Sequence, residues 1–391
     1  MTPAARQSAG IAIIDRILAG EPAEAALTRW ARGARYAGSG DRDAVRDWVF
    51  RALRQRRSAR AWSGAEAESG RALMLGMLRM DGMRPEGWTG KHHAPAPLTE
   101  AEASSLSAPP PVLSRGEAGD IPDWMLPLFD AALGAQADTV LKCLRERAPV
   151  FVRVHARRAQ VAEVIAELAT AGITAAPHPL ARQALQLEGA TRRLKQTAAF
   201  AEGRVELQDL ASQAVTETMA AHLPAGGSVL DYCAGGGGKA LALAAMGFAV
   251  SAHDADPRRM RGLLPRAERA GDRVALVETP RRNWPCVLAD VPCSGSGSWR
   301  RAPEAKWRLT PGRLAALQAT QDAILTRCAD LVAPGGLLAF ATCSLFREEN
   351  AERIAAFHDH LPGWSEIAQH VWTPLDDGDG FFLSLLRRAS T

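Results

Sequence analysis

The sequence is poor in tyrosine, in lysine and in long apolar stretches. Tyrosine occurs twice in 391 residues, and lysine supplies five of the 47 basic side chains. No apolar run reaches the roughly 18 residues that a membrane span needs. The first twenty residues also lack the basic start, apolar block and small-residue cleavage site of a signal peptide. These absences exclude the membrane and secreted classes, so we expect a cytoplasmic protein with no membrane partner.

The six cysteines form no pattern typical of a metal site or of a disulfide framework. No two of them form a CxxC pair, and none has a zinc-like spacing from histidine. In a reducing compartment they should be free thiols that are either packed or reactive. We therefore expect no bound metal. The cysteines are Cys143, Cys233, Cys286, Cys293, Cys328 and Cys343.

Positive charge gathers near the N-terminus. The net charge of the chain is +4, and residues 1–60 hold twelve arginines and six acidic residues. This balance suits a polyanionic partner such as a nucleic acid, although a solvated helical face rich in arginine has the same composition. Ile11, Ile14 and Leu18 recur at helical spacing, and Asp41 follows a Gly-Ser-Gly run as a candidate helix start. Residues 1–83 are therefore predicted to be helical.

The middle of the chain changes character twice. Residues 84–120 are rich in proline, glycine, serine and histidine, which predicts a linker or an extended loop. Beyond them, Val150–Val154 has the composition of a strand, and residues 160–171 have the pattern of a helix that ends at Gly172. Residues 121–200 are therefore predicted to form a small α/β domain.

Residues 201–391 alternate strands and helices. Such alternation predicts a parallel sheet with helices on both faces. In a sheet of this kind the ligand lies beyond the carboxyl ends of the strands, near the point where the strand order reverses. The predicted strands cover residues 228–232, 248–253, 273–277, 287–290, 336–342 and 381–386. The predicted helices cover residues 239–245, 257–270, 311–331 and 347–360.

A glycine loop follows the first of these strands. It is not a phosphate-binding P-loop, because Ala240 follows Lys239, and the dinucleotide fingerprint GxGxxG is also absent. Asp254 ends the second strand, where it could accept hydrogen bonds from ribose hydroxyls or cap a helix. A glycine loop and a ribose-binding acid without phosphate-binding features favour S-adenosylmethionine over a tight turn that binds nothing. The predicted cofactor-binding residues are Cys233, Ala234, Gly235, Gly236, Gly237, Gly238, Lys239, Asp254 and Asp290.

Two cysteines follow strand ends. Cys293 comes shortly after Asp290 at the end of the fourth strand, and Cys343 comes after the fifth. If the two strands are neighbours they lie about 4.8 Å apart, which brings both thiols to one rim of the sheet. A thiolate that adds to C6 of cytosine makes C5 nucleophilic toward a sulfonium methyl, and Asp290 could hydrogen-bond or protonate the ring. One such cysteine could be packing alone; the pair predicts chemistry, but does not reveal which thiol attacks.

The catalytic half resembles the RsmB/Nop/Sun family of RNA 5-methylcytosine methyltransferases. The resemblance implies a class I methyltransferase fold, Rossmann-like with a seven-stranded, mostly parallel sheet, and S-adenosylmethionine as cofactor. It also implies that Cys343 is the nucleophile and that Cys293 assists release. The motifs that carry it, in chain order, are Gln-Asp-Leu-Ala-Ser-Gln at 208–213, the glycine loop at 231–239, Asp-x-Pro-Cys-Ser-Gly at 290–295, Arg-Arg-x-Pro-x-x-Lys-Trp at 300–307, Thr-Cys-Ser at 342–344 and Asp-Gly-Phe-Phe at 379–382.

The sequence departs from the family pattern at two places. Gly235 and Gly236 replace Ala and Pro of the usual Cys-Ala-Ala-Pro-Gly-Gly-Lys loop, which makes the loop more flexible. The family also carries an acid after the third strand, on the adenine side of the cofactor, and Glu278 is the one candidate for it here.

The resemblance extends to RNA as the substrate. The helical N-terminus resembles the NusB-like RNA-binding domain of the RsmB branch, which methylates 16S ribosomal RNA, and the small α/β domain is RRM-like. Arg300, Arg301 and Lys306 are the predicted RNA-binding residues, because arginine and lysine bind phosphates while the adjacent Trp299 could stack a base or be a buried side chain of a surface loop.

These predictions combine into a monomeric RNA (cytosine-C5)-methyltransferase that acts on 16S rRNA. The alternatives are the same chemistry on tRNA, a non-catalytic RNA-binding assembly factor, and a methyltransferase for small molecules or proteins, which would not need paired cysteines. The predicted domains are a NusB-like domain at 1–83, a linker at 84–120, a small RNA-binding domain at 121–200 and the catalytic domain at 201–391.

Overall fold

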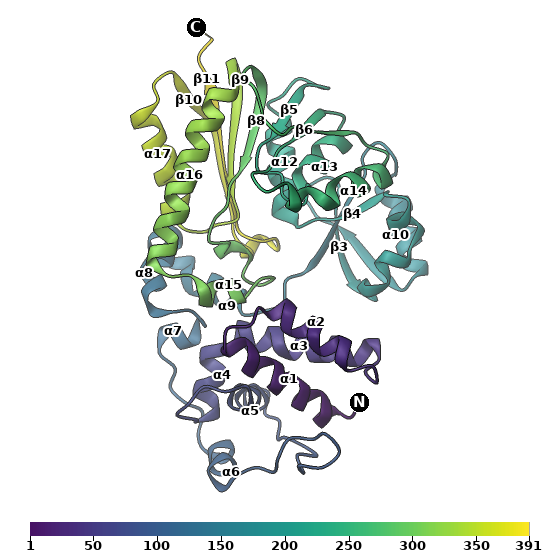
Figure 1. Cartoon of the computed structure of the whole chain (residues 1–391), viewed down its shortest axis with the longest axis vertical. Helices are drawn as coiled ribbons and strands as arrows, with labels where there is room; N and C mark the ends of the chain where they lie inside the picture. The colour runs from purple at the N-terminus through teal and green to yellow at the C-terminus, as the bar shows by residue number, and fades with distance from the viewer. Residues whose placement is uncertain (391) are drawn as a thin grey trace. The chain divides into compact units, whose positions relative to one another are not determined.

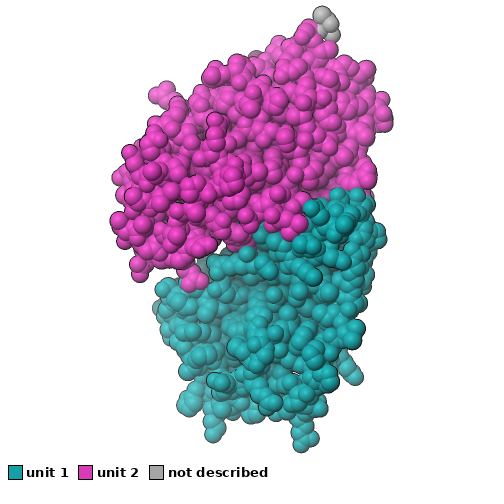
Figure 2. Space-filling model, turned by 180° about the vertical axis from the view of Figure 1, so that it is seen from behind, with its two compact units in different colours: residues 1–147, 299–308 teal, residues 148–298, 309–391 magenta. Residues whose placement is uncertain are grey.

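The structure is a computed structural model that describes residues 1–390. The chain divides into two compact units, coloured separately in Figure 2. Unit 1 comprises residues 1–147 together with 299–308, and unit 2 comprises residues 148–298 and 309–391. The division predicted from the sequence, into three domains and a linker, stays a prediction.

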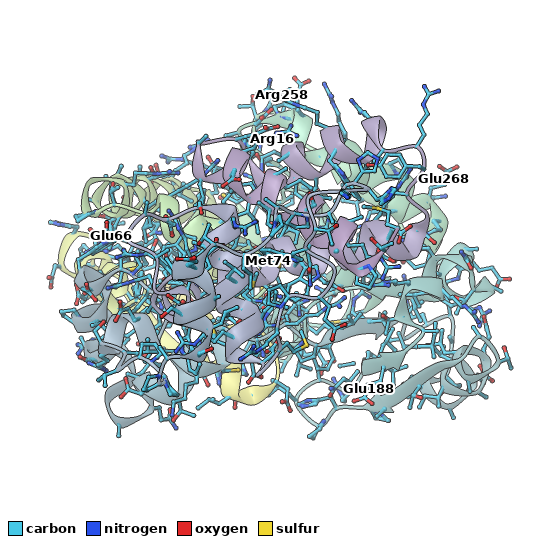
Figure 3. All side chains as sticks on the ribbon, turned by 90° about the horizontal axis from the view of Figure 1, so that it is seen from below. Arg16, Glu66, Met74, Glu188, Arg258 and Glu268 are labelled. Atoms are coloured by element: carbon cyan, nitrogen blue, oxygen red, sulfur yellow. The ribbon has the colours of Figure 1, made fainter. Side chains whose placement is uncertain are left out.

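Unit 1 is helical, as Figure 1 shows in purple and blue. Its core packs aliphatic side chains such as Ile14, Val49 and Leu73, and Met74, labelled in Figure 3, is fully buried among them. The first five helices are α1 (Pro3–Leu18), α2 (Ala23–Gly33), α3 (Ser39–Arg54), α4 (Arg56–Ser63) and α5 (Gly70–Met80). Helices α4 and α5 approach closely, because a Cβ at Gly76 would lie 1.7 Å from the carbonyl oxygen of Ala59.

Asp41 caps α3 from within its first turn. The helix begins at Ser39, two residues before the predicted start, and the Asp41 carboxylate accepts a hydrogen bond from the Gly38 backbone N–H at 3.1 Å. An acidic side chain in the first turn also interacts favourably with the helix dipole. Asp41 therefore marks the start of the helix as predicted, but it lies in the first turn and not at the position before it.

The segment predicted as a linker contains two short helices. These are α6 (Glu100–Ser107) and α7 (Arg115–Ala118). Each begins with a capping box, in which Thr99 or Ser114 accepts from a backbone N–H and a glutamate three residues later reaches back. Arg71 and Arg79 on α5 donate to backbone carbonyls of the segment, so it is held against the helical core.

Unit 1 is completed by elements from two parts of the chain. The first part adds η1 (Asp123–Met125), α8 (Leu126–Leu133), η2 (Gly134–Gln136) and α9 (Ala137–Leu144). The second part, residues 299–308, contains α15 (Glu304–Arg308).

Unit 2 begins with a four-stranded antiparallel sheet. The strand order is β2-β3-β1-β4, and α10 (Val161–Thr170) packs Val164 and Leu168 against it. The strands are β1 (Val150–Val154), β2 (Ile173–Pro177), β3 (Ala184–Gly189) and β4 (Val205–Leu207). Two short helices, η3 (Thr191–Gln196) and α11 (Ala198–Ala201), lie between β3 and β4 in the chain.

The larger sheet of unit 2 has seven strands in the order β10-β11-β9-β8-β5-β6-β7. Strands β9, β8, β5, β6 and β7 run parallel to one another, and β11 is antiparallel to both of its neighbours, β9 and β10. The predicted class I fold with a mostly parallel seven-stranded sheet is confirmed. The strands are β5 (Ser228–Asp231), β6 (Ala249–Ala252), β7 (Val274–Leu276), β8 (Trp284–Asp290), β9 (Val332–Thr342), β10 (Trp364–Trp372) and β11 (Phe381–Arg388).

Helices cover both faces of this sheet, because alternate strand residues point to opposite sides. Leu288 belongs to the core beneath the first group of helices, and Val287 and Ala289 to the core beneath the second. The first group is α12 (Leu210–Ala220), α13 (Gly238–Ala245), η4 (Pro257–Gly262) and α14 (Leu263–Ala270). The second is α16 (Pro311–Leu331) and α17 (Ala351–His360). The strand order reverses between β5 and β8, which places the expected ligand site at their carboxyl ends. Within residues 1–390, no helix is both long and apolar enough to cross a bilayer.

Candidate active site

The glycine loop joins β5 to α13 and needs glycine at two positions. Gly235 and Gly237 have φ angles of +51° and +82°, in the left-handed region that glycine tolerates best. A Cβ at Gly237 would also lie 1.7 Å from Leu263 Cδ1. These glycines therefore allow the loop backbone to turn tightly at the end of β5.

Asp231 ends β5 beneath this loop. Burial, with the neighbouring Asp290 carboxylate, raises its pKa to about 7. Its Oδ1 is buried and has no hydrogen-bond partner within residues 1–390. A buried acceptor without a donor fits the amino group of a bound ligand, since buried polar atoms are otherwise almost always paired. Asp231 is not among the predicted cofactor-binding residues, although an acid that ends a strand directly before a glycine loop is a usable signal.

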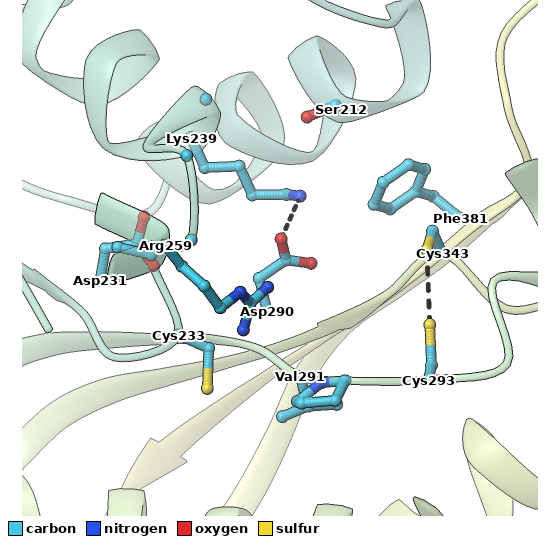
Figure 4. Close-up of a pocket in the computed structure, with 15 residues that line it drawn as sticks. Ser212, Asp231, Cys233, Lys239, Arg259, Asp290, Val291, Cys293, Cys343 and Phe381 are labelled. Carbon is cyan, nitrogen blue, oxygen red and sulfur yellow. Dashed lines mark hydrogen bonds and ion pairs between the residues drawn. The ribbon is translucent and has the colours of Figure 1, made fainter. Parts of the chain in front are cut away.

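Lys239 and Asp290 form an ion pair across the cavity, as Figure 4 shows. Lys239 Nζ lies 2.7 Å from Asp290 Oδ2 and 4.6 Å from the centroid of the Phe381 ring. Burial alone would lower the pKa of Lys239, but the Asp290 carboxylate raises it above its ordinary value. Lys239 is therefore a cation that orients the Asp290 carboxylate.

Cys293 and Cys343 meet at the rim of the sheet. Strands β8 and β9 are parallel neighbours, as the sequence predicted, and the two sulfur atoms lie 3.4 Å apart (Figure 4). Both cysteines are free thiols. The hydrogen bond with Cys343, together with burial, raises the pKa of Cys293 well above its ordinary value. Cys293 is therefore held as a neutral thiol beside the Cys343 sulfur.

One cavity of about 480 Å³ contains the glycine loop, the ion pair and both thiols. This volume is within the range of about 300–1,000 Å³ that small-molecule sites occupy. Seven of the predicted cofactor-binding residues line it: Cys233, Ala234, Gly235, Gly236, Gly238, Lys239 and Asp290. Ser212, Asp231, Arg259 and Phe381 line it as well and were not predicted. Burial raises the pKa of Cys233, so this third lining thiol stays protonated.

The other two predicted cofactor-binding residues, Gly237 and Asp254, do not line the cavity. Asp254 is buried; its Oδ2 accepts a hydrogen bond from Gly235 N at 2.9 Å and lies 3.2 Å from Arg259 Nη1. In this structure Asp254 thus holds the glycine loop, and its contact with a ribose stays a prediction. Glu278 is exposed and does not line the cavity.

The three predicted RNA-binding residues all belong to unit 1 but differ in exposure. Arg301 is exposed, whereas Arg300 and Lys306 are buried at 4% and 1% exposure. Lys306 Nζ donates to the backbone carbonyl of Arg54 at 2.9 Å, and burial lowers its pKa to about 7. These contacts give Lys306 a structural place in the helical core and do not support its predicted contact with RNA.

The segment around Lys306 makes further bonds within unit 1. Trp307 Nε1 donates to Leu53 O at 2.7 Å, and the Glu304 carboxylate accepts from Ala23 N at 3.1 Å. Trp299 is fully buried against Phe129. The reading of Trp299 as a buried side chain is therefore correct, and it has no face open for stacking a base.

Comparisons with known proteins identify the family. The model described as 16S rRNA methyltransferase RsmB/F matches residues 219–387, and the model described as Methyltr_RsmF/B-like, ferredoxin-like domain matches residues 121–192. Ribosomal RNA small subunit methyltransferase B of Xanthomonas campestris pv. campestris is 32% identical over 294 residues, which cover 69% of this chain and 67% of that protein. The chain belongs to the RsmB/F family of rRNA methyltransferases. The resemblance noted from its motifs is confirmed.

Other relatives agree. The RsmB/F member from Vibrio cholerae, also named ribosomal RNA small subunit methyltransferase B, is 32% identical over 68% of this chain and 65% of that protein. The chain thus spans about two thirds of the length of these relatives. Among solved structures, the crystal structure of PH0851 covers 99% of both chains with a TM-score of 0.80 and 20% identity. A methyltransferase homolog protein from Pyrococcus horikoshii covers 70% of this chain and 97% of that chain, with a TM-score of 0.61 and 21% identity. These two structural similarities support the fold.

Membership of the RsmB/F family makes the chain an S-adenosylmethionine-dependent methyltransferase with RNA as its substrate class. The residues present fit the cofactor, because the cavity offers close backbone approach at the glycine loop and the buried Asp231 Oδ1 as an acceptor. No cluster of His, Cys, Asp or Glu in residues 1–390 could hold a metal ion.

Proposed function

We propose that this enzyme methylates C5 of a cytosine in 16S rRNA through a covalent bond between Cys343 and C6 of the base. The observation that carries the proposal is the pair of sulfur atoms 3.4 Å apart, in the same cavity as the glycine loop. A methyltransferase that acts on a nucleophilic nitrogen or oxygen would need no thiol there. Cytosine C5 does need one, because it becomes nucleophilic only after a thiolate has added to C6.

The proposed reaction uses the two sulfur atoms in turn. Cys343 adds through Sγ to C6, and the electron pair of the C5–C6 double bond moves toward C5 and the ring. S-adenosylmethionine, when bound, supplies the methyl group, which C5 takes as S-adenosylhomocysteine forms. A base then removes the C5 proton, the double bond returns, and Cys343 leaves C6 as a thiolate.

The electrostatics of Cys293 suit the last of these steps. Its thiol is held neutral 3.4 Å from the Cys343 sulfur, so it can donate a hydrogen bond to that sulfur as negative charge develops. Such a donor stabilises the leaving thiolate. This gives Cys343 the role of nucleophile and Cys293 the role of assisting release.

Asp290 is proposed to contact the base. Its carboxylate projects into the cavity between the glycine loop and the thiols, and Lys239 holds it at 2.7 Å. A carboxyl group there can hydrogen-bond or protonate the ring as electron density rises in it. The target cytosine must leave its stack to reach this site, at roughly a few kcal/mol unless it is already unpaired.

16S rRNA is the proposed substrate because the relatives are named as small-subunit rRNA methyltransferases. We further propose that the enzyme is a cytoplasmic monomer, and that the helical region 1–83, the domain at 121–200 and the exposed Arg301 bind RNA. The proposed division into domains, with the linker at 84–120 and the catalytic domain at 201–391, assigns the cavity to the last of them. The same chemistry on tRNA is the competing function.

Bisulfite sequencing of rRNA and tRNA from a strain without the gene tests the proposal. One 16S rRNA cytosine should lose its methylation, and the wild-type gene but not Cys343→Ala should restore it. A change confined to tRNA would transfer the same chemistry to the competing substrate. Unchanged cytosines in both RNAs would overturn the function.

A further inference from the structure

Glu349 is a fully buried carboxylate between the two cysteine loops. It ends η6 (Arg347–Glu349), and its exposed fraction is 0%. Ser294 directly follows Cys293, Ser344 directly follows Cys343, and both serines hydrogen-bond to this one carboxylate. The two thiols are thus linked through the residues next to them.

Four donors converge on this carboxylate. Its Oε1 accepts from Ser294 N at 2.8 Å and from Gln321 Nε2 at 3.0 Å. Its Oε2 accepts from Ser344 Oγ at 2.5 Å and from Ser294 Oγ. An ionised carboxylate only accepts hydrogen bonds, so it matches four donors in a way that no neutral side chain of the same size does. Hydrogen bonds to a charged acceptor are also about twice as strong as neutral ones.

We infer that Glu349 is a positioning residue, which holds the Cys293 loop against the nucleophile and so sets the distance between the two sulfur atoms. The inference rests on the proposed function, because it matters only if both thiols act on the same base. It concerns geometry and not contact with the substrate, since Glu349 does not line the cavity.

The two loops depend on Glu349 to different degrees. The Cys343 loop has anchors of its own: Asn350 Nδ2 donates to Ser344 O at 2.9 Å, and Ser344 N donates to Thr342 Oγ1 at 3.1 Å. Strand β9 before it pairs on both sides, with β8 and β11. In the other loop, both the backbone N–H and the hydroxyl of Ser294 go to Glu349. Loss of the carboxylate should therefore displace Cys293 more than Cys343, and slow release more than attack.

The far end of the Cys293 loop has a separate anchor. Gly297 N donates to Cys343 O at 2.9 Å, and the Ser296 hydroxyl accepts from Leu345 N at 2.7 Å. These bonds keep the loop near β9 without Glu349, so a variant at Glu349 should loosen the thiol and leave the sheet intact.

Glu349→Gln is the test variant. It keeps the shape of the side chain, but one acceptor becomes an NH2 group. In the Oε1 position this group faces the N–H donors of Ser294 and Gln321, and in the Oε2 position it forces the two serine hydroxyls to accept instead of donate. Glu352→Gln, at an exposed position of α17 three residues on, is the matched control. With unmethylated 16S rRNA and S-adenosylmethionine, we measure methyl transfer per enzyme and the fraction of enzyme bound to RNA on denaturing gels.

Glu349→Gln should slow turnover about tenfold or more, the scale expected when a reacting group is misplaced. The covalent fraction should rise severalfold above wild type, as in Cys293→Ala, while the melting temperature stays near that of Glu352→Gln. Turnover equal to that of Glu352→Gln would overturn the inference. So would a parallel fall of turnover and adduct, which indicates a merely structural role.

Three further proteins keep the result interpretable. If Glu349→Gln does not fold, Ser294→Ala removes the hydroxyl that joins the Cys293 loop to Glu349 and, at 3.2 Å, to Ser344 Oγ, and it carries the same expectation. Wild type and Cys293→Ala are assayed beside them. If wild type transfers no methyl group and Cys293→Ala forms no adduct, the proposed function fails. If both behave as expected while Glu349→Gln matches its control, only the role of Glu349 fails.

Discussion

The Lys239 ammonium lies 2.7 Å from the Asp290 carboxylate, and this ion pair joins the first turn of α13 to the end of β8. The two residues come from the glycine loop and from the cysteine motif. The pair therefore ties the cofactor side of the cavity to the side where the base is proposed to bind.

Replacing Lys239 should disable the site. Lys239→Met leaves the Asp290 carboxylate beside the buried Asp231 without a cation, and should lower kcat/KM for RNA by roughly 100-fold, the lower end of the contribution typical of a positioned acid or base. Lys239→Arg keeps the charge but replaces the compact ammonium by a planar guanidinium, so its kcat/KM should lie between those of wild type and Lys239→Met. Steady-state methyl transfer measures the effect, with the exposed Lys142→Met as control. Equal rates for Lys239→Met and the control would refute the role of the pair.

The two cysteines should fail differently. Cys343→Ala should abolish methyl transfer and adduct, whereas Cys293→Ala should trap a covalent enzyme–RNA complex that survives denaturing gels. Cys286→Ala, a buried cysteine on β8 that does not line the cavity, should keep the chemistry. Full activity in Cys343→Ala would disprove the mechanism, and an adduct in Cys343→Ala instead of Cys293→Ala would exchange their roles.

A methyl group at Gly237 should prevent cofactor binding. The φ of +82° and the 1.7 Å approach to Leu263 Cδ1 leave no room for a Cβ. Titration calorimetry with S-adenosylhomocysteine should show at least about a tenfold weaker Kd for Gly237→Ala, equivalent to about 1.4 kcal/mol. Gly262→Ala has no atom within 4 Å of the new Cβ and should bind as wild type does. An unchanged Kd for Gly237→Ala would mean that the loop is not the cofactor site.

The buried Lys306 should make the free energy of unfolding increase with pH above neutrality. Its pKa of about 7 in the folded protein lies below the ordinary 10.5, so between these values the unfolded chain binds more protons. The free energy of unfolding should therefore rise with pH across this window, by at most about 1.4 kcal/mol per pH unit. Urea unfolding at pH 7.5 and 9 should show this gain in wild type and a smaller one in Lys306→Met. Identical pH dependence in both proteins would contradict the burial of a neutral lysine.

Much of the catalytic domain was predictable because its central strands are short apolar runs. Strand β10 escaped prediction because most of its side chains are at least partly exposed at the sheet edge, so no apolar pattern marks it. The segment 84–120 misled for a related reason, since its composition hides two helices whose start signals are the capping boxes at Thr99 and Ser114.

The site shows the same division between local and tertiary information. Cys293 and Cys343 were predictable because each follows a strand, and parallel neighbours bring strand ends together. Glu349 was not, since three of its four donors belong to Ser294 and Gln321, which are distant from it in sequence. Lys306 shows the opposite case: a lysine in a motif loop resembles a phosphate ligand, but its ammonium is buried and donates to the backbone carbonyl of Arg54, which is distant in sequence.

The placement of residues 299–308 within the helical unit restricts how this enzyme can be divided. A fragment that starts at residue 148 would keep Trp299, Lys306 and Trp307 but lose the carbonyls and ring that surround them. In such a fragment the ten residues after the Cys293 motif would expose side chains that are buried in the full chain, such as Trp299, and the fragment should aggregate on expression. For the same reason, replacing the helical unit by another domain would also require replacing residues 299–308, which lie within the catalytic sequence.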